Sequence, residues 1–376
     1  MQSPIGMVRL VISIVMLASV VACGAVSSSA QKIAGPNRGG ASRDDAIARA
    51  QVWSPTDVSS MDVRTGPTGH GEFPFNATVT CDYIPKELAG GSPKFACVSG
   101  DDELKVKYSA PANGYIAGQS NAEVFAEVAA TRLLWALGFG ADAMYPVRVA
   151  CHKCPSSLGG IARVNDERMF DPATIERKMA GHEFEPDSGW SWNDLNDVDP
   201  QRGGASVAQR DALKLLAVFL QHTDTKPQQQ RLLCQGPKVP AEGPTTTCDR
   251  PFMMISDLGL TFGKANMMNS NGKGMNYVDW ASTPVWKEGE TRCVGNLSKS
   301  FTGTLKDPVI SEAGRAFLAD LLTKLTDDQI RGLFEVSRVT LRLRDPGKAK
   351  SGFSTVEEWT DVFKRKRAEI VNRQCA

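Results

Sequence analysis

HTDTKPQQQ, residues 222–230, follows directly on the apolar run ALKLLAVFLQ, residues 212–221. The apolar run is typical of a buried helix, and Pro227 prevents that helix from continuing. Four polar groups then stand at fixed offsets: His222, Asp224, Lys226 and Gln229. A chain that ends a buried helix in this way forms either a solvated loop or a site that handles phosphate and metal.

A second stretch, FMMISDLGL at residues 252–260, begins as an apolar strand and places Asp257 33 residues after Asp224. HTDTKPQQ aligns without a gap to the protein-kinase catalytic-loop pattern H-R-D-L-K-P-E-N, and FMMISDLGL resembles the D-F-G segment with its preceding strand. Together the motifs resemble an atypical, secreted bacterial kinase-like protein, and the resemblance covers roughly residues 76–340 in order. The expected fold is therefore α+β and two-lobed, with a strand-rich N-lobe carrying one main helix and a mostly helical C-lobe.

Two stretches nearer the N-terminus resemble further kinase segments and follow the order in which kinases have them. ELKVKYS, residues 103–109, resembles the strand that carries the phosphate-gripping lysine, and Lys105 and Lys107 share one face of it because side chains alternate along a strand. EVAATRLLWALGF, residues 127–139, resembles the helix that carries the glutamate partner, for which Glu123 and Glu127 compete. We favour Lys107 and Glu127, and leave Lys105 and Glu123 as alternatives.

The resemblance implies binding of ATP with Mg²⁺, or with Mn²⁺. Lys107, Glu127 and the glycine-rich hairpin tip at Gly90 and Gly91 would hold the nucleotide phosphates, and Met179 is assigned to the same nucleotide site. Asp257 and Gln229 would be metal ligands, since Mg²⁺ prefers oxygen atoms. Asp224 would orient the acceptor hydroxyl and Lys226 would steady the transferring phosphate.

Several departures from the kinase pattern bear on activity. Thr223, Thr225 and Gln228 differ from it, and Leu258 takes the aromatic position. Gln229 adds a methylene where kinases have asparagine, and no A-P-E segment follows. The predicted function is transfer of the ATP γ-phosphate to a hydroxyl of an unidentified protein or small molecule. The alternatives are a pseudokinase that binds nucleotide or a partner, and a nucleotidyl transferase on the same scaffold.

The first 30 residues are typical of an export leader. Arg9 precedes the apolar LVISIVMLASVVAC, which is too short to span a bilayer comfortably. VVAC resembles a bacterial lipobox with Cys23 as the lipidated residue, and ordinary cleavage near residue 30 is the alternative. We therefore expect an exported protein, either periplasmic, membrane-anchored or secreted, with a Gly-, Ser- and Pro-rich tether at residues 31–75, an N-lobe at 76–180 and a C-lobe at 181–376.

Cysteine spacing and charge complete the sequence-based expectations. Eight cysteines follow Cys23, and their spacing predicts four disulfides. C151-H-K-C154 is also compatible with a redox pair or half a zinc site, although no second half is evident. The predicted pairs are Cys81 with Cys97, Cys151 with Cys154, Cys234 with Cys248, and Cys293 with Cys375. The formal net charge of +1 gives no indication of a nucleic-acid partner.

Overall fold

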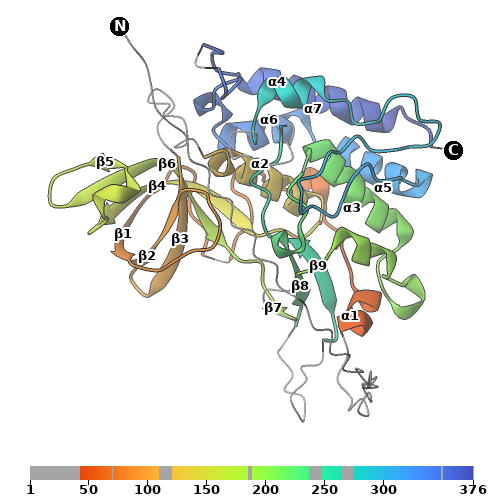
Figure 1. Ribbon diagram of the computed structural model, residues 1–376, viewed down its shortest axis with the longest axis horizontal. Coiled ribbons are helices and arrows are strands. Elements are labelled where there is room, and N and C mark those ends of the chain that lie inside the picture. The colour runs from red at the N-terminus through yellow and green to blue at the C-terminus, as the bar shows by residue number, and fades with distance from the viewer. Residues whose placement is uncertain are drawn as a thin grey trace, which may run out of the picture. The chain divides into compact units, whose positions relative to one another are not determined.

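Five strands from the first half of the chain close into a small barrel (Figure 1). β1 (Thr78–Ile84), β2 (Lys94–Ser99) and β3 (Asp102–Tyr108) form an antiparallel meander. β4 (Ala143–His152) pairs with β1 and with β6 (Glu167–Arg177), and β6 also pairs with β3. Short β5 (Ile161–Ala162) extends β6. Closure pairs both sides of each of the five long strands, so apolar residues fill the interior and the outer face is free for polar groups.

The computed structural model describes residues 43–69, 71–109, 121–184, 189–236, 248–263, 274–348 and 350–375. The predicted leader and Cys23 lie outside these residues. Within them, no helix combines the length and apolar character needed to cross a bilayer.

Helix α2 (Glu123–Ala136) is buried on nearly every side. It packs against β3, β4 and β6 and, on its other side, against α6 (Asp327–Val336). The helix ends where Gly138 adopts a φ of +85°, and a Cβ there would lie 2.1 Å from the carbonyl oxygen of Ser54. Glycine is required at this stop, and the helix predicted over this stretch is confirmed.

The C-terminal half is mostly helical. Its main helices are α3 (Val207–Leu220), α5 (Glu312–Thr323), α6 and α7 (Val356–Val371), with the short α4 (Tyr277–Ser282). Ser206 caps α3 in a reciprocal arrangement with Gln209. A second sheet of β7 (His182–Glu183), β8 (Gln230–Cys234) and β9 (Pro251–Ile255) lies in the same half. The α+β class predicted from the sequence is confirmed.

An aromatic cluster joins these helices. Trp280 stacks on Trp359 at 5.5 Å between ring centroids, and Phe334 stacks on Trp359 at 5.6 Å. Lys366 of α7 is buried beside them, with its ammonium over the Trp280 ring and donating to the carbonyl oxygen of Thr283. A lysine in this position is held away from water and keeps one backbone partner.

The segment at residues 43–69, which belongs to the predicted tether at 31–75, is packed rather than extended. It forms α1 (Arg43–Arg49), and its apolar residues belong to the main core. Arg132 of α2 donates to the carbonyl oxygen of Val63 at 2.9 Å, which fixes the segment against that helix. Its buried apolar positions follow no single period along the segment, so sequence periodicity could not reveal them: Ala46, Ile47, Ala48, Ala50, Val52, Val58 and Val63.

The four predicted disulfides are present: Cys81–Cys97, Cys151–Cys154, Cys234–Cys248 and Cys293–Cys375. The first joins β1 to β2, and the third joins the end of β8 to the approach to β9. The last closes a loop with a sequence separation of 82 residues. Four disulfides are consistent with an oxidising, exported location.

Candidate functional site

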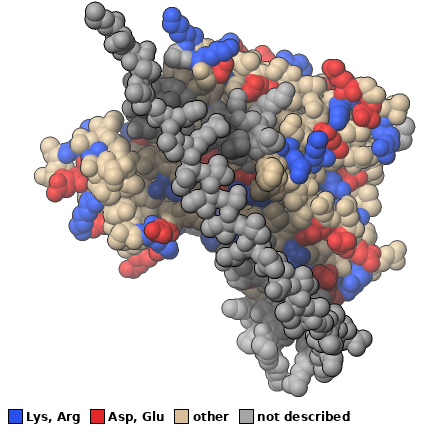
Figure 2. All heavy atoms as spheres, viewed as in Figure 1, with Lys and Arg blue, Asp and Glu red and all other residues tan. Residues whose placement is uncertain are grey.

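A cavity of about 800 Å³ is lined by side chains from well-separated parts of the chain. They come from the β1–β2 hairpin tip, β3, α2, the loop after α3 and the segment after β9. On the part of the face in Figure 2 that is not covered by grey atoms, acidic and basic side chains are interspersed, without a large patch of one sign. We therefore look for a charged binding site inside the cavity and not on that outer face.

Lys107 is the most enclosed basic side chain among the described residues that line the cavity. Its ammonium lies 2.6 Å from Glu127 Oε1 and 2.9 Å from Glu123 Oε2, and only 3% of the residue is exposed. Lys105, on the same strand face, is instead bonded to Glu176 of β6 at 2.5 Å. The structure thus pairs Lys107 with both candidate glutamates of α2 and directs Lys105 to a different acid.

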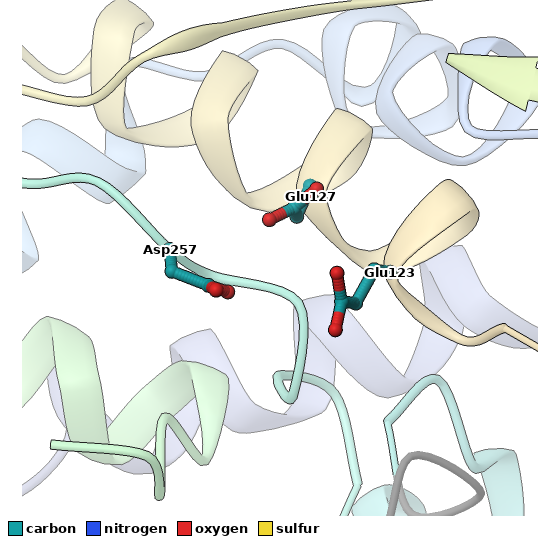
Figure 3. Close-up of side chains that lie close together, drawn as sticks. All are labelled: Glu123, Glu127 and Asp257. Atoms are coloured by element: carbon teal, nitrogen blue, oxygen red, sulfur yellow. The ribbon is translucent and has the colours of Figure 1, made fainter. Parts of the chain in front are cut away.

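Asp257 completes a group of three carboxylates around Lys107. One oxygen each of Glu123, Glu127 and Asp257 lies within 4.8 Å of the others. Figure 3 shows these carboxylates facing a common space, two from α2 and one from the segment after β9. The arrangement can hold a cation, and in the described structure the Lys107 ammonium serves as that cation for Glu123 and Glu127.

The charges in this group shift one another's pKa values. Burial alone would lower the pKa of Lys107, but Glu127, Asp257 and Glu123 raise it well above its ordinary value, so the ammonium stays charged. Burial would raise the pKa of Asp257, yet Lys107 and the N–H of Gly259 lower it to about 2. For Glu127, burial raises the pKa and the other two acids add to that rise, which outweighs Lys107. Three acids share one lysine, so the group carries excess negative charge.

The loop at residues 222–230 places Asp224 on the same cavity. α3 ends at Gln221, which has a φ of +54°, and the chain then runs extended to a 3₁₀ turn at Pro227–Gln229. Asp224 Oδ2 accepts from Gln229 Nε2 at 2.6 Å and lies 3.3 Å from the ammonium of Lys226. Asp224 Oδ1 is buried without a hydrogen-bond partner and can accept a proton donor.

Other residues of the loop shape it. His222 is fully buried, and burial lowers its pKa to about 4, so the ring is neutral at physiological pH. Thr225 Oγ1 accepts from the backbone N–H groups of Thr304 and Leu305, each at 3.1 Å. These contacts of Thr225 fix the backbone directly after Asp224.

Gln229 links the two motifs. Its backbone carbonyl accepts from the N–H of Ser256 at 2.8 Å and from the N–H of Asp257 at 3.3 Å. Its side-chain amide is engaged with Asp224, although both Gln229 and Asp257 line the cavity. The β8–β9 hairpin is therefore what brings together Asp224 and Asp257, which are 33 positions apart in the sequence.

Of the remaining residues predicted to bind nucleotide, two line the cavity and one does not. Gly90 and Gly91 line the cavity, as expected for the hairpin tip. Among the described lining residues Met179 does not occur: it packs with Leu233, Phe252 and Met254, and its N–H donates to Asp142 Oδ1 at 2.7 Å. The structure does not bring Met179 to the other candidates.

Several charged residues of the cavity were not selected from the sequence. Arg231 bonds to Asp142 and to Glu183, and burial raises the pKa of Asp142 to about 6 against the opposing effect of Arg231. Lys94 also lines the cavity. The sequence could have pointed to Lys94. Lys94 and Lys107 are equidistant from the turn between β2 and β3, so they face each other across the hairpin.

Comparison with known proteins gives only distant structural similarity. No family model and no curated protein matches the sequence. The structure is similar to the crystal structure of a Helicobacter pylori proinflammatory kinase, CtkA, with a TM-score of 0.40 and 12% identity, over 79% of this chain and 96% of that one. Function is therefore inferred from the geometry of the site itself.

Proposed function

We propose that this chain is an exported kinase-like phosphotransferase, which moves the γ-phosphate of ATP to a hydroxyl of a protein or small-molecule acceptor. One observation carries the proposal. Lys107, Glu127, Asp224 and Asp257 come from four separate segments and line or directly adjoin one cavity. Phosphoryl transfer needs such an arrangement, because it depends on positioning and charge neutralisation more than on covalent chemistry.

The residues fit a divalent metal. Asp257 has a lowered pKa and stays ionised, and carboxylate and amide oxygens are hard ligands of the kind Mg²⁺ and Mn²⁺ prefer. Asp257 would hold the metal, with Gln229 as a second candidate ligand through its amide oxygen. A bound metal would neutralise charge on the donor phosphates.

The chain's own groups would then do the following. Lys107, held by Glu127, binds oxygen atoms of the donor phosphates, and the backbone at Gly90 and Gly91 allows close approach. The unpartnered Oδ1 of Asp224 accepts a hydrogen bond from the acceptor hydroxyl and orients it. Lys226, 3.3 Å from Asp224, adds positive charge where the phosphate passes.

A pseudokinase is the second candidate, and one contact favours it. The amide of Gln229 donates to Asp224 at 2.6 Å, so it is oriented toward the acid. If that contact persists when nucleotide binds, Gln229 offers no oxygen to a metal and Asp224 is partly occupied. The same cavity would then bind nucleotide without turning it over.

The test begins with thermal unfolding of the purified, disulfide-bonded protein. We expect ATP with Mg²⁺ or Mn²⁺ to raise the melting temperature, and Asp257→Ala to abolish the rise. Asp197→Ala, at an exposed acid outside the cavity, is the matched control and should keep it. A protein that ignores nucleotide and metal at millimolar levels contradicts both candidates.

Labelled ATP separates the candidates. Transfer of the γ-phosphate supports the phosphotransferase, and binding without transfer supports the pseudokinase. Transfer of the α-phosphate with its nucleoside would instead select a nucleotidyl transferase.

A further inference from the structure

The cavity holds one lysine that makes no ion pair. Five of the six basic side chains among the described lining residues lie within 4.0 Å of a carboxylate. The exception is Lys94, whose ammonium donates to Ser92 Oγ at 3.2 Å. These six are Lys94, Lys105, Lys107, Lys178, Lys226 and Arg231.

Lys94 lies directly opposite Lys107. The two residues are register partners in the antiparallel pair of β2 and β3, so their side chains project from the same face of the barrel. Like charges at directly opposed positions are destabilising. Lys107 has two acids of its own, whereas Lys94 stands beside it with none in contact. Lys94 is therefore the basic side chain of the described cavity lining that is left to pair with an anionic ligand.

The hairpin tip holds the Lys94 side chain inside the cavity. A Cβ on Gly90 would lie 2.8 Å from its ammonium, so the ammonium lies close against this glycine. Lys94 is half-buried, and burial lowers its pKa against the opposing effect of Glu123, while Lys107 and Lys105 add to the lowering. An anion placed between the tip and Lys107 would relieve both the desolvation and the repulsion.

We propose that Lys94 is a second phosphate-binding lysine, which acts together with Lys107 and the Gly90–Gly91 backbone to hold an oligophosphate chain. The ligand class is a multivalent phosphate, carried either by a nucleoside triphosphate or by inorganic oligophosphate. A multivalent anion fits best, because two ammonium groups on neighbouring strands can each bind different phosphate oxygens of one molecule. The inference deepens the proposed function and rests on it only for the identity of the donor.

The experiment measures binding of inorganic tripolyphosphate, ATP and AMP to the purified, disulfide-bonded protein by titration calorimetry without divalent metal. Lys94→Met should weaken binding of tripolyphosphate and ATP by about tenfold or more, the effect of losing one hydrogen bond between charged groups. Lys86→Met is the matched control, since Lys86 lies on the same hairpin but pairs with the exposed Glu103 outside the cavity. It should change the affinity by less than about twofold. Binding of ATP but not tripolyphosphate would assign the site to the nucleotide, and equal binding of both would assign it to the phosphate chain.

A folding defect is distinguishable from a loss of binding. Without anion, Lys94→Met should melt at the wild-type temperature or above it, because the variant loses a repulsion and no ion pair. Unchanged phosphate affinity in Lys94→Met, an equal loss in Lys86→Met, or no binding by the wild type would each overturn the inference. If ATP with Mg²⁺ is bound and turned over while Lys94→Met behaves as wild type, this inference fails and the proposed function stands. If phosphate binding depends on Lys94 but no transfer from ATP occurs, the inference stands and the proposed function fails.

Discussion

The charge balance around Lys107 predicts an asymmetry between two substitutions at one ion pair. Lys107→Met removes the single cation that three carboxylates share, whereas Glu127→Gln removes one of three acids and keeps an oxygen that can accept from Lys107. At an effective dielectric constant of about 20, the contacts at 2.6 and 2.9 Å each supply roughly 6 kcal/mol of attraction before desolvation. Burial offsets much of this attraction, so we expect Lys107→Met to lower the free energy of unfolding by about 3–5 kcal/mol, the usual cost of stranding buried charge.

Glu127→Gln should change the free energy of unfolding by no more than about 1 kcal/mol, because Lys107 keeps Glu123 at 2.9 Å. Burial and then the neighbouring acids raise the pKa of Glu127. A carboxylate with a raised pKa is disfavoured in the folded protein, so its replacement by a neutral amide should cost little. Lys105→Met is the matched control on the same strand face. Its pair with Glu176 has the lysine side chain 36% exposed, so the loss should stay at or below about 1 kcal/mol.

Urea unfolding of the oxidised protein, followed by the fluorescence of its buried tryptophans, measures all three variants. A loss for Glu127→Gln as large as that for Lys107→Met would refute the reasoning, since it would mean that the acids are not in excess. A loss for Lys105→Met equal to that for Lys107→Met would refute it as well, because burial would then have no part in the cost.

Two further predictions concern the C-terminal half. Burial lowers the pKa of Lys366 to about 8 from 10.5, so between these values the unfolded chain holds a proton that the folded chain has lost. The free energy of unfolding of the wild type should therefore rise relative to that of Lys366→Met, by up to about 3 kcal/mol, as pH increases across that window. Urea melts at several pH values measure this difference. A difference that stays constant with pH would contradict the lowered pKa of Lys366. Double serine substitution of Cys293 and Cys375, which lie 82 residues apart in the sequence, should cost about 4–5 kcal/mol, against about 1–2 for Cys151 and Cys154, which lie 3 apart. Equal losses in urea would show that loop length does not determine the contribution.

Local sequence patterns were enough to select the paired charges of the site. The period of two along a strand placed Lys105 and Lys107 on one face, and the helical period placed Glu123 and Glu127 on another. These patterns could not decide which lysine meets which acid. That choice depends on β6, which pairs with β3 and supplies Glu176 to Lys105, and nothing within residues 102–108 signals this distant partner.

Long-range contacts explain what the sequence did not reveal. Closure of the barrel needs β3 to pair with a strand that begins about 60 residues later, and such pairing leaves no local periodicity. The segment 43–69 is built into the core by scattered residues and by backbone contacts such as that from Arg132 to Val63. Met179 was assigned to the nucleotide site, and the structure instead packs it, partly buried, against residues of β8 and β9.

Gln229 has a larger role than its place in the motif suggests. Its backbone carbonyl receives the N–H groups of Ser256 and Asp257, and its side chain holds Asp224, so one residue connects the proposed metal ligand to the proposed acceptor-binding acid. An asparagine is one methylene shorter. At position 229 it would keep the backbone contacts, which do not depend on the side chain, while its amide would be drawn away from Asp224. Gln229 therefore fixes the geometry of both acids in the absence of ligand and leaves Asp224 Oδ1 free to accept a hydrogen bond.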